Sequence, residues 1–194
     1  MKKLLIILLS ILLISIPVQA GKRYQYSDNP TLDSEIENIY HEQKALTDSV
    51  DYKTDAKCRA YLSSAQDNIP NATWTKVNLD AETYDIGNNF NTTLNRFIAP
   101  ISGYYQVNGS VGWGALVTDK TWLTGIRVNG VGVTYGRAHS SHSGYLTVPV
   151  SDIIHLNKDD YVELYCYQGS GEATADLLNS SPYTFMAVHL ISRD

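Results

Sequence analysis

The sequence is poor in cysteine, in positive charge and in long hydrophobic runs, and each shortage excludes a class of protein. With two cysteines in 194 residues, a small fold held together by several disulfides is excluded. The formal net charge is -5, and no run of basic residues is longer than two. Because binding of nucleic acid or of anionic membranes needs basic clusters, we expect no nucleic-acid partner.

The one long hydrophobic run stands at the N-terminus, where Lys2 and Lys3 precede the apolar segment from Leu4 to Ile16. This run is shorter than the roughly 20 apolar residues that a membrane-spanning helix needs. Small residues follow it up to Ala20, which is typical of a secretory signal peptide over residues 1–20. We therefore predict cleavage after Ala20 and a secreted mature chain without a membrane span. The alternative is an uncleaved anchor.

A helical pattern follows, within a predicted linker and helix over residues 21–55. Asn29 suits the N-cap position and Pro30 suits the first helical position. Positions then repeat at alternating spacings of four and three, which is the seam of a short coiled coil with one polar member. The seam consists of Leu32, Ile36, Ile39, Gln43, Leu46 and Val50. We predict a self-associating stalk, and the alternative is a helix packed on its own domain.

The period changes after the helix, and residues 56–194 show many short strand patterns separated by turn residues. The clearest alternation runs from Tyr161 to Tyr167, and Val128–Asn129–Gly130 is a hairpin signal between two such patterns. Strands without intervening helical patterns predict an all-β domain, either a sandwich, a jelly roll or a barrel. The fourteen tyrosines, against three phenylalanines, fit sheets with one solvated face.

The two cysteines, Cys58 and Cys166, both lie in strand patterns with apolar residues two positions away. Both side chains could therefore enter one core from different strands. In an exported protein they are a candidate disulfide. The alternative is two buried free thiols that pack as small hydrophobic residues.

The most suggestive cluster of reactive residues is RAHSSHSG, which spans Arg137–Gly144. Its histidines, His139 and His142, have no zinc-site spacing, and no carboxylate or cysteine ligand follows them. No nucleophile-elbow sequence is present that would support a triad. We interpret this segment as a solvated loop between strands and predict that the protein is not an enzyme.

The acidic pairs carry a weaker signal. Asp159–Asp160 is typical of a turn before a strand, and Glu172 and Asp176 lie in a long polar loop. Oxygen ligands in that loop could bind calcium, but no defined calcium-loop spacing is present. We therefore predict no cofactor and no metal site, with calcium as the alternative.

The three tryptophans, Trp74, Trp113 and Trp122, all lie in strand patterns. Large aromatic side chains dominate cores and interfaces. We predict core or interface packing for all three tryptophans, in preference to a sugar-binding platform.

One spacing of aromatic and small residues resembles the signature of the complement C1q globular head. That signature has an aromatic residue, Asn or Asp, a second aromatic, a phenylalanine and then Gly-x-Tyr. The matching positions are Asp85, Phe90, Phe97, Gly103 and Tyr105. The positions that depart from the pattern are Leu79, Val107 and Gly109. The resemblance extends over about residues 56–194.

The resemblance implies a ten-stranded jelly roll, related to the tumour-necrosis-factor ligands, that assembles as a homotrimer. Such heads often follow a trimerising stalk. Because the chain has no Gly-x-y repeat, the heptad helix would take the place of a collagen stalk. The calcium and ligand residues of the family match no motif here, so the ligand-binding residues stay unknown.

We therefore expect a secreted, non-enzymatic, trimeric recognition or adhesion module that binds an unknown extracellular protein or glycan. The alternative is a structural component of an exported surface, appendage or virion. A glycosidase would need two carboxylates across a cleft, and no pair here is singled out by its spacing.

Overall fold

The computed structural model describes residues 30–194, and the predicted signal peptide and linker up to residue 29 lie outside the described residues. The chain divides into two units, residues 1–45 and 46–194. The stalk boundary predicted at residue 55 stays a prediction.

The helix α2 runs from Pro30 to Thr54, so Pro30 takes the first helical position as predicted. Along the predicted seam, Leu32 and Leu46 are 44% and 65% exposed, whereas Ile36 and Ile39 are partly buried. The side chain of Val50 lies outside the described part of the chain. Within residues 30–194, no helix has the length and apolar character that a membrane crossing requires.

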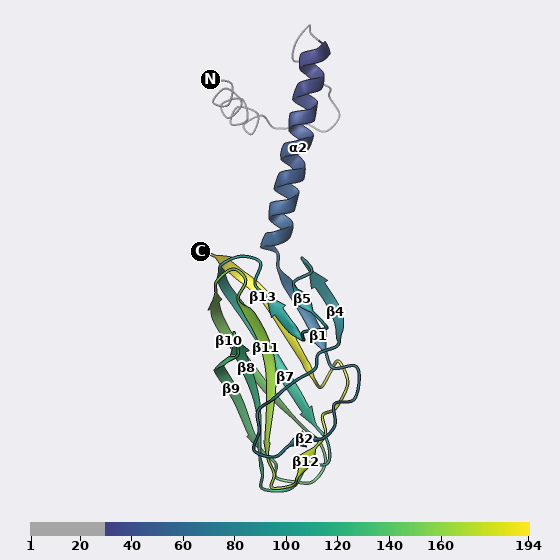
Figure 1. Ribbon diagram of the computed structural model, residues 1–194, viewed down its shortest axis with the longest axis vertical. Coiled ribbons are helices and arrows are strands. Elements are labelled where there is room, and N and C mark those ends of the chain that lie inside the picture. The colour runs from purple at the N-terminus through teal and green to yellow at the C-terminus, as the bar shows by residue number, and fades with distance from the viewer. Residues whose placement is uncertain (1–29) are drawn as a thin grey trace. The chain divides into compact units, whose positions relative to one another are not determined.

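The head, from residue 56 onward, contains two main sheets (Figure 1). The first sheet has the order β10-β7-β13-β1-β4, and all of its neighbouring strands are antiparallel. Its strands, in that order, are Leu146–Leu156, Gly103–Trp113, Phe185–Arg193, Lys57–Tyr61 and Ala81–Ile86.

The second sheet has the order β5-β6-β11-β8-β9 and is also antiparallel. Its strands, in that order, are Phe90–Asn91, Arg96–Ile98, Tyr161–Gly169, Thr121–Val128 and Val131–His139. The short strand β3 (Thr75–Lys76) pairs with β11. The strands β2 (Ile69–Pro70) and β12 (Thr174–Ala175) form a small sheet at the end of the head opposite the C-terminus.

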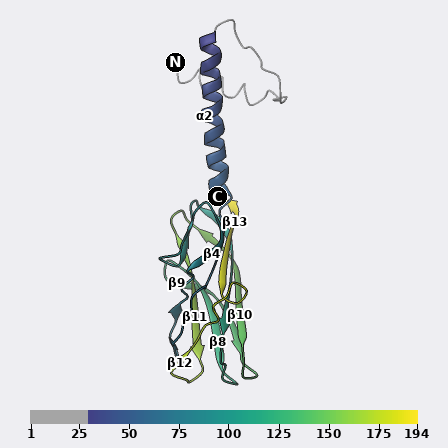
Figure 2. The same cartoon turned by 90° about the vertical axis from the view of Figure 1, so that its right-hand side faces the viewer.

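The two main sheets pack face to face, with β9 and β11 in one layer and β10 and β13 in the other (Figure 2). Aromatic pairs join the layers: Trp113 lies 4.9 Å from Trp122, and Phe97 lies 5.7 Å from Tyr105, between ring centroids. All four side chains are buried. The two stacked antiparallel sheets confirm the predicted all-β jelly-roll sandwich, and ten of their eleven strands lie in the two main orders.

The hairpin predicted at Val128–Gly130 joins β8 to β9. Asn129 and Gly130 have positive φ angles of 52° and 80°, which is the backbone of a tight two-residue hairpin turn. The Asn129 side chain also donates a hydrogen bond to Asp160 at 2.8 Å and accepts one from the backbone N–H of Tyr161 at 3.0 Å. This asparagine therefore links two turns at the same end of the head.

The signature residues build the core around one corner. The Tyr105 hydroxyl donates a hydrogen bond to the carbonyl of Ile101 at 2.8 Å, and Asp85 accepts one from the N–H of Phe90 at 2.8 Å. At Gly103, a Cβ atom would stand 2.3 Å from the carbonyl oxygen of Ser192. Only glycine therefore lets β7 approach β13 this closely.

The two cysteines are buried free thiols in the structure. Cys58 lies on β1 of the first sheet and Cys166 lies on β11 of the second. Burial raises the pKa of both thiols, to about 12 for Cys166, so both stay protonated and unreactive. The structure therefore shows the free-thiol alternative, and the candidate disulfide stays a prediction.

Candidate functional site

The histidine segment contributes strand as well as loop. The strand β9 extends through His139, which corrects the prediction that the whole segment Arg137–Gly144 is a loop. Nε2 of His139 lies 3.0 Å from the Thr121 hydroxyl oxygen, within hydrogen-bond distance, whereas Nδ1 of His142 lies 3.4 Å from the Ser141 hydroxyl oxygen. Within residues 30–194, no group of three histidine, cysteine or carboxylate side chains is placed to hold a metal ion.

The Asp159–Asp160 pair belongs to the turn between β10 and β11, as predicted. Asp160 accepts hydrogen bonds from the Asn129 side chain and from the backbone and side chain of Asn157. The bond from Asn129 is the main cause that lowers the pKa of the Asp160 carboxyl. The Asp160 carboxylate therefore joins the β10–β11 turn to the β8–β9 turn.

The second acidic pair has a similar structural use. Asp176 accepts a hydrogen bond from the backbone N–H of Asn68 at 2.9 Å. Glu172 is exposed, and its backbone N–H donates to the Ser170 hydroxyl at 3.0 Å. Asp176 thus holds the loop before β2, and the suggestion of calcium in this loop stays a prediction.

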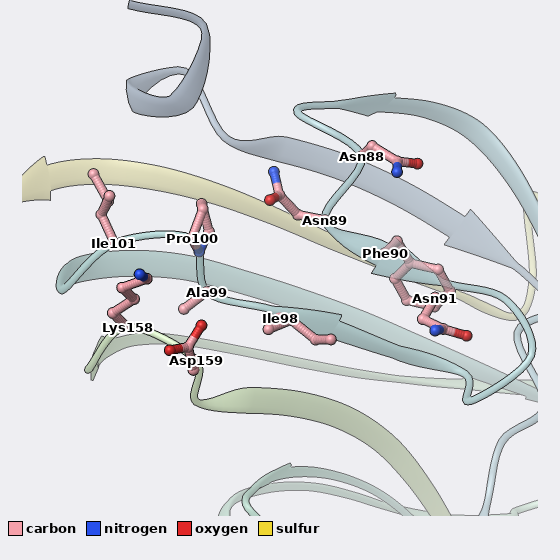
Figure 3. Close-up of a pocket in the computed structure, with 10 residues that line it drawn as sticks. All are labelled: Asn88, Asn89, Phe90, Asn91, Ile98, Ala99, Pro100, Ile101, Lys158 and Asp159. Carbon is pink, nitrogen blue, oxygen red and sulfur yellow. The ribbon is translucent and has the colours of Figure 1, made fainter. Parts of the chain in front are cut away.

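One hollow, of about 510 Å³, lies at the end of the head where β1 begins (Figure 3). We call it the end hollow. Its residues come from the β4–β5 turn, from β5, from β6 and the segment after it, and from the β10–β11 turn (Figure 3). They are Asn88, Asn89, Phe90, Asn91, Ile98, Ala99, Pro100, Ile101, Lys158 and Asp159.

Most polar groups of the end hollow already serve the turns. The Asn89 side chain donates to the carbonyl of Ile86 at 3.2 Å, and the Asn91 side chain accepts from the N–H of Leu94 at 2.8 Å. The N–H of Asp159 donates to the carbonyl of Ala99 at 2.8 Å. These hydrogen bonds show that the asparagines stabilise turns. The end hollow therefore has few polar groups left to bind a ligand.

A second hollow, of about 530 Å³, lies on the outer face of the second sheet. We call it the sheet hollow. It lies towards the β9 edge of the sheet, because its residues belong to β8, β9, β11 and the segment just before β3. They are Trp74, Thr121, Leu123, Arg137, Tyr167 and Gly169.

The wall of the sheet hollow is aromatic and firmly seated. The Trp74 ring lies 5.0 Å from the ring of Tyr135 and 5.4 Å from that of Tyr167, between centroids. It rests over Gly125 of β8, where an added Cβ would stand 2.9 Å from Trp74 and 3.1 Å from Tyr135. The missing side chain of Gly125 therefore makes the seat on which these two rings lie.

The rim of the sheet hollow is polar. The Arg137 guanidinium donates through Nη2 to the Thr121 hydroxyl at 3.4 Å and to Nε2 of His139 at 3.3 Å. The ion pairs within the described part of the chain join Lys57 to Asp55, Lys76 to Glu163 and His155 to Asp194. Arg137 therefore has no carboxylate partner among residues 30–194, although its charge is permanent.

A further arginine supports the aromatic wall from behind. The Arg127 guanidinium lies 4.0 Å from the ring centroid of Tyr165 and 5.7 Å from that of Trp74. Such cation–π contacts stabilise the ring positions. Burial raises the pKa of the Tyr165 hydroxyl, so this tyrosine stays neutral.

The tryptophans divide between two environments. Trp113 and Trp122 are 0% and 1% exposed in the core, which bears out packing for these two. Trp74 is partly buried on the outer face and belongs to the wall of a hollow, so it is not a core residue, and interface packing for it stays a prediction. Sequence reasoning missed this site, although a glycine inside the β8 strand pattern was a usable signal.

The outer face of the first sheet has a different character. Tyr104 on β7 and Ile153 on β10 are 49% and 56% exposed. They are diagonal neighbours, because Tyr104 pairs with His155 and Gln106 pairs with Ile153. We call Tyr104 and Ile153 the first-sheet patch.

Comparison with solved structures places the head among known folds. The structure of murine APRIL at pH 5.0 matches with a TM-score of 0.56 and 13% identity, over 71% of this chain and 99% of that one. The globular domain of zebrafish complement 1qA gives 0.53 and 13%, over 72% and 99%. Eiger TNF from S. frugiperda gives 0.56 and 7%, over 73% and 95%.

These likenesses show that the head has the C1q/TNF-like jelly-roll fold, which confirms the fold that the signature implied. No family model matches the chain, and no curated protein does. At these identities the likeness concerns the fold, and function has to be argued from the sites.

Proposed function

We propose that the mature chain is a secreted, non-enzymatic recognition or adhesion module that assembles as a homotrimer. The observation that carries the proposal is the occurrence, in one chain, of a heptad helix followed by a head with the C1q/TNF-like fold. The family that the signature resembles assembles as trimers. Three copies on one stalk would turn weak single-site contacts into useful avidity.

The seam of α2 supports self-association. Leu32 is 44% exposed in the single chain, and a narrow apolar seam gains stability only when another surface covers it. Gln43 at a core position of the seam would then set the register of the helices.

The first-sheet patch supports contact between heads. Tyr104 and Ile153 are large side chains, about half exposed, on adjacent strands. Exposed neighbouring apolar side chains of this size are typical of interaction surfaces. We therefore place part of the subunit interface on the outer face of the first sheet.

Light scattering on residues 21–194 tests the assembly. We expect three times the chain mass at micromolar concentration. A clean monomer under these conditions would contradict the proposal. Deletion of residues 31–50 should weaken assembly, and a trimer of unchanged stability would show that the stalk is dispensable.

A pair of substitutions tests the patch. Ile153→Glu should shift the equilibrium towards monomer, because it buries a charge in the contact. Val131→Glu is the matched control, since Val131 is 68% exposed on β9 of the second sheet. Equal assembly of both variants and the unmodified chain would remove the patch from the interface.

A further inference from the structure

We infer that the sheet hollow binds a saccharide unit that carries a carboxylate, such as a uronic acid. The inference rests on the proposed function, because it names the class of ligand that the recognition module takes. The two features behind it are a seated aromatic wall and an arginine without a carboxylate partner among the described residues.

The aromatic wall suits one face of a sugar ring. Trp74 and Tyr167 both line the hollow, with their ring planes inclined at 46°. Aromatic faces carry partial negative charge, so they attract the C–H groups on the apolar face of a pyranose. Because Trp74 rests on Gly125 and against Tyr135, the wall is formed before any ligand arrives.

The polar rim supplies charge and direction. Arg137 is oriented through Nη2 by Thr121 and His139, which leaves its remaining N–H groups available. A guanidinium presents its donors in the geometry that a carboxylate accepts as two parallel hydrogen bonds. A carboxylate on the sugar would therefore find its partner beside the stacking face.

The position of the hollow disfavours an extended peptide. It lies over β8 and β11, whose backbone groups are paired with each other and, in β8, also with β9. Peptides that join a sheet need a free edge for main-chain hydrogen bonds. Over β8 and β11 a ligand gains affinity from side chains, and a flat ring uses that surface best; the edge strand β9 contributes Arg137.

Charge disfavours a nucleic acid. One free guanidinium matches one carboxylate, whereas strand binding requires a basic track along several phosphates.

Calorimetric titration of residues 21–194 with methyl glucuronoside tests the inference, with methyl glucoside as the matched sugar that lacks the carboxylate. For a ligand of this size we expect a dissociation constant on the order of 1 mM for the glucuronoside. The glucoside should bind about tenfold more weakly, because it lacks the charge-assisted bonds. Absence of binding well above this concentration, or equal binding of the two sugars, would overturn the inference.

Variants assign the two features separately. Arg137→Gln should weaken glucuronoside binding about tenfold, to the level of the glucoside, and leave glucoside binding unchanged. Arg193→Gln on the first sheet is the control and should bind both sugars normally. Trp74→Ala should abolish binding of both sugars, whereas Trp74→Phe should retain part of it. Unchanged binding in Trp74→Ala or Arg137→Gln would contradict the site.

Two further measurements test whether nucleic acid or a second subunit occupies the sheet hollow instead. Oligothymidylate that bound more tightly than the glucuronoside, and through Trp74 and Arg137, would overturn the inference in favour of nucleic acid. Trp74 fluorescence that is shielded from acrylamide in the assembled protein would make the hollow a subunit interface, which also overturns it. We expect neither result.

Light scattering on the same samples separates this inference from the proposed function. A trimer that binds neither sugar contradicts the saccharide site alone. A monomer that binds the glucuronoside contradicts the assembly alone.

Discussion

The tryptophans of the two sheet faces show what separates a structural aromatic from a candidate binding aromatic. Trp122 is 1% exposed, pairs with Trp113 across the sandwich, and donates its indole N–H to the Ser140 hydroxyl at 3.1 Å. Trp74 also has aromatic neighbours, but its ring remains part of a surface hollow. The rings therefore differ in their exposure: Trp122 is enclosed by the core, whereas Trp74 is only partly buried and lines a surface hollow.

Glycines beside the aromatic residues help to distinguish the two faces, because each glycine leaves room for a neighbouring group. Gly103 lets two strands of the first sheet close on each other, and so serves the fold. Gly125 leaves room for the rings of Trp74 and Tyr135 on the outside of the second sheet. Gly103 therefore allows close strand packing within the first sheet, whereas Gly125 fixes the position of aromatic rings on the surface of the second sheet.

The largest effect is expected when an inner ring is removed. Trp122→Ala should lower the free energy of unfolding by about 3–5 kcal/mol, because it leaves a cavity and removes the partner of Trp113. Urea denaturation followed by circular dichroism measures this loss. A loss below about 1 kcal/mol would mean that the inner pair does not hold the sandwich together.

Adding a side chain at Gly103 should have the next largest effect on the free energy of unfolding. Gly103→Ala should cost about 1–3 kcal/mol of unfolding free energy, since the new Cβ would meet the Ser192 carbonyl. Gly114→Ala is the control, because a Cβ there would meet its nearest atom at 3.5 Å. Equal denaturation midpoints for the two variants would contradict the close approach of β7 and β13.

Removing the outer ring should affect stability less. Trp74→Ala should lower the free energy of unfolding by about 1 kcal/mol, which corresponds to the loss of partly exposed ring contacts. The same denaturation experiment checks this value. A loss as large as that of Trp122→Ala would show that Trp74 is a core residue, and the contrast between the two faces would fail.

The smallest effect concerns acid. The pKa of Asp160 is lowered in the folded chain from its ordinary value of 3.8, mainly by the Asn129 hydrogen bond. Its stabilising contribution is therefore fully present above pH 3.8 and is lost as pH falls through the lower, folded pKa. Asp160→Asn should flatten this part of a curve of stability against pH.

Asp159→Asn, in the same turn, is the control for replacing a carboxyl group by an amide at this end of the head. Both curves come from denaturation at a series of pH values from neutrality downward. If Asp160→Asn follows the unmodified chain throughout the acid range, the bond from Asn129 does not stabilise the folded state.

Local patterns were enough to predict several of the strands and turns of the head. The alternation of β11, the hairpin at Asn129 and the corner between Phe97 and Tyr105 all depend on neighbouring residues, and the structure contains each of them. The sequence did not predict the strand β4 (Ala81–Ile86). Its segment AETYDI is polar and largely exposed at a sheet edge. Edge strands bury little, so they leave little hydrophobic pattern.

The sheet hollow could not be predicted in the same way. Trp74 is far from Gly125 and Arg137 in the sequence, and the pairing of β3 and β8 with β11 brings it beside the β8–β9 hairpin. Such a site depends on long-range pairing, whereas sequence periodicity reports which face is buried. The glycine within the β8 strand pattern was the one local sign of a close approach.

The inner aromatic residues hold the fold, and the outer aromatic residues are proposed to bind the ligand. The chain has three tryptophans, so a ¹H–¹⁵N spectrum of residues 21–194 shows their three indole groups separately. On titration with methyl glucuronoside, we expect a saturable shift of the Trp74 indole signal, with those of Trp113 and Trp122 unmoved. A Trp74 signal that stays in place at saturating sugar, or equal shifts of all three signals, would contradict it.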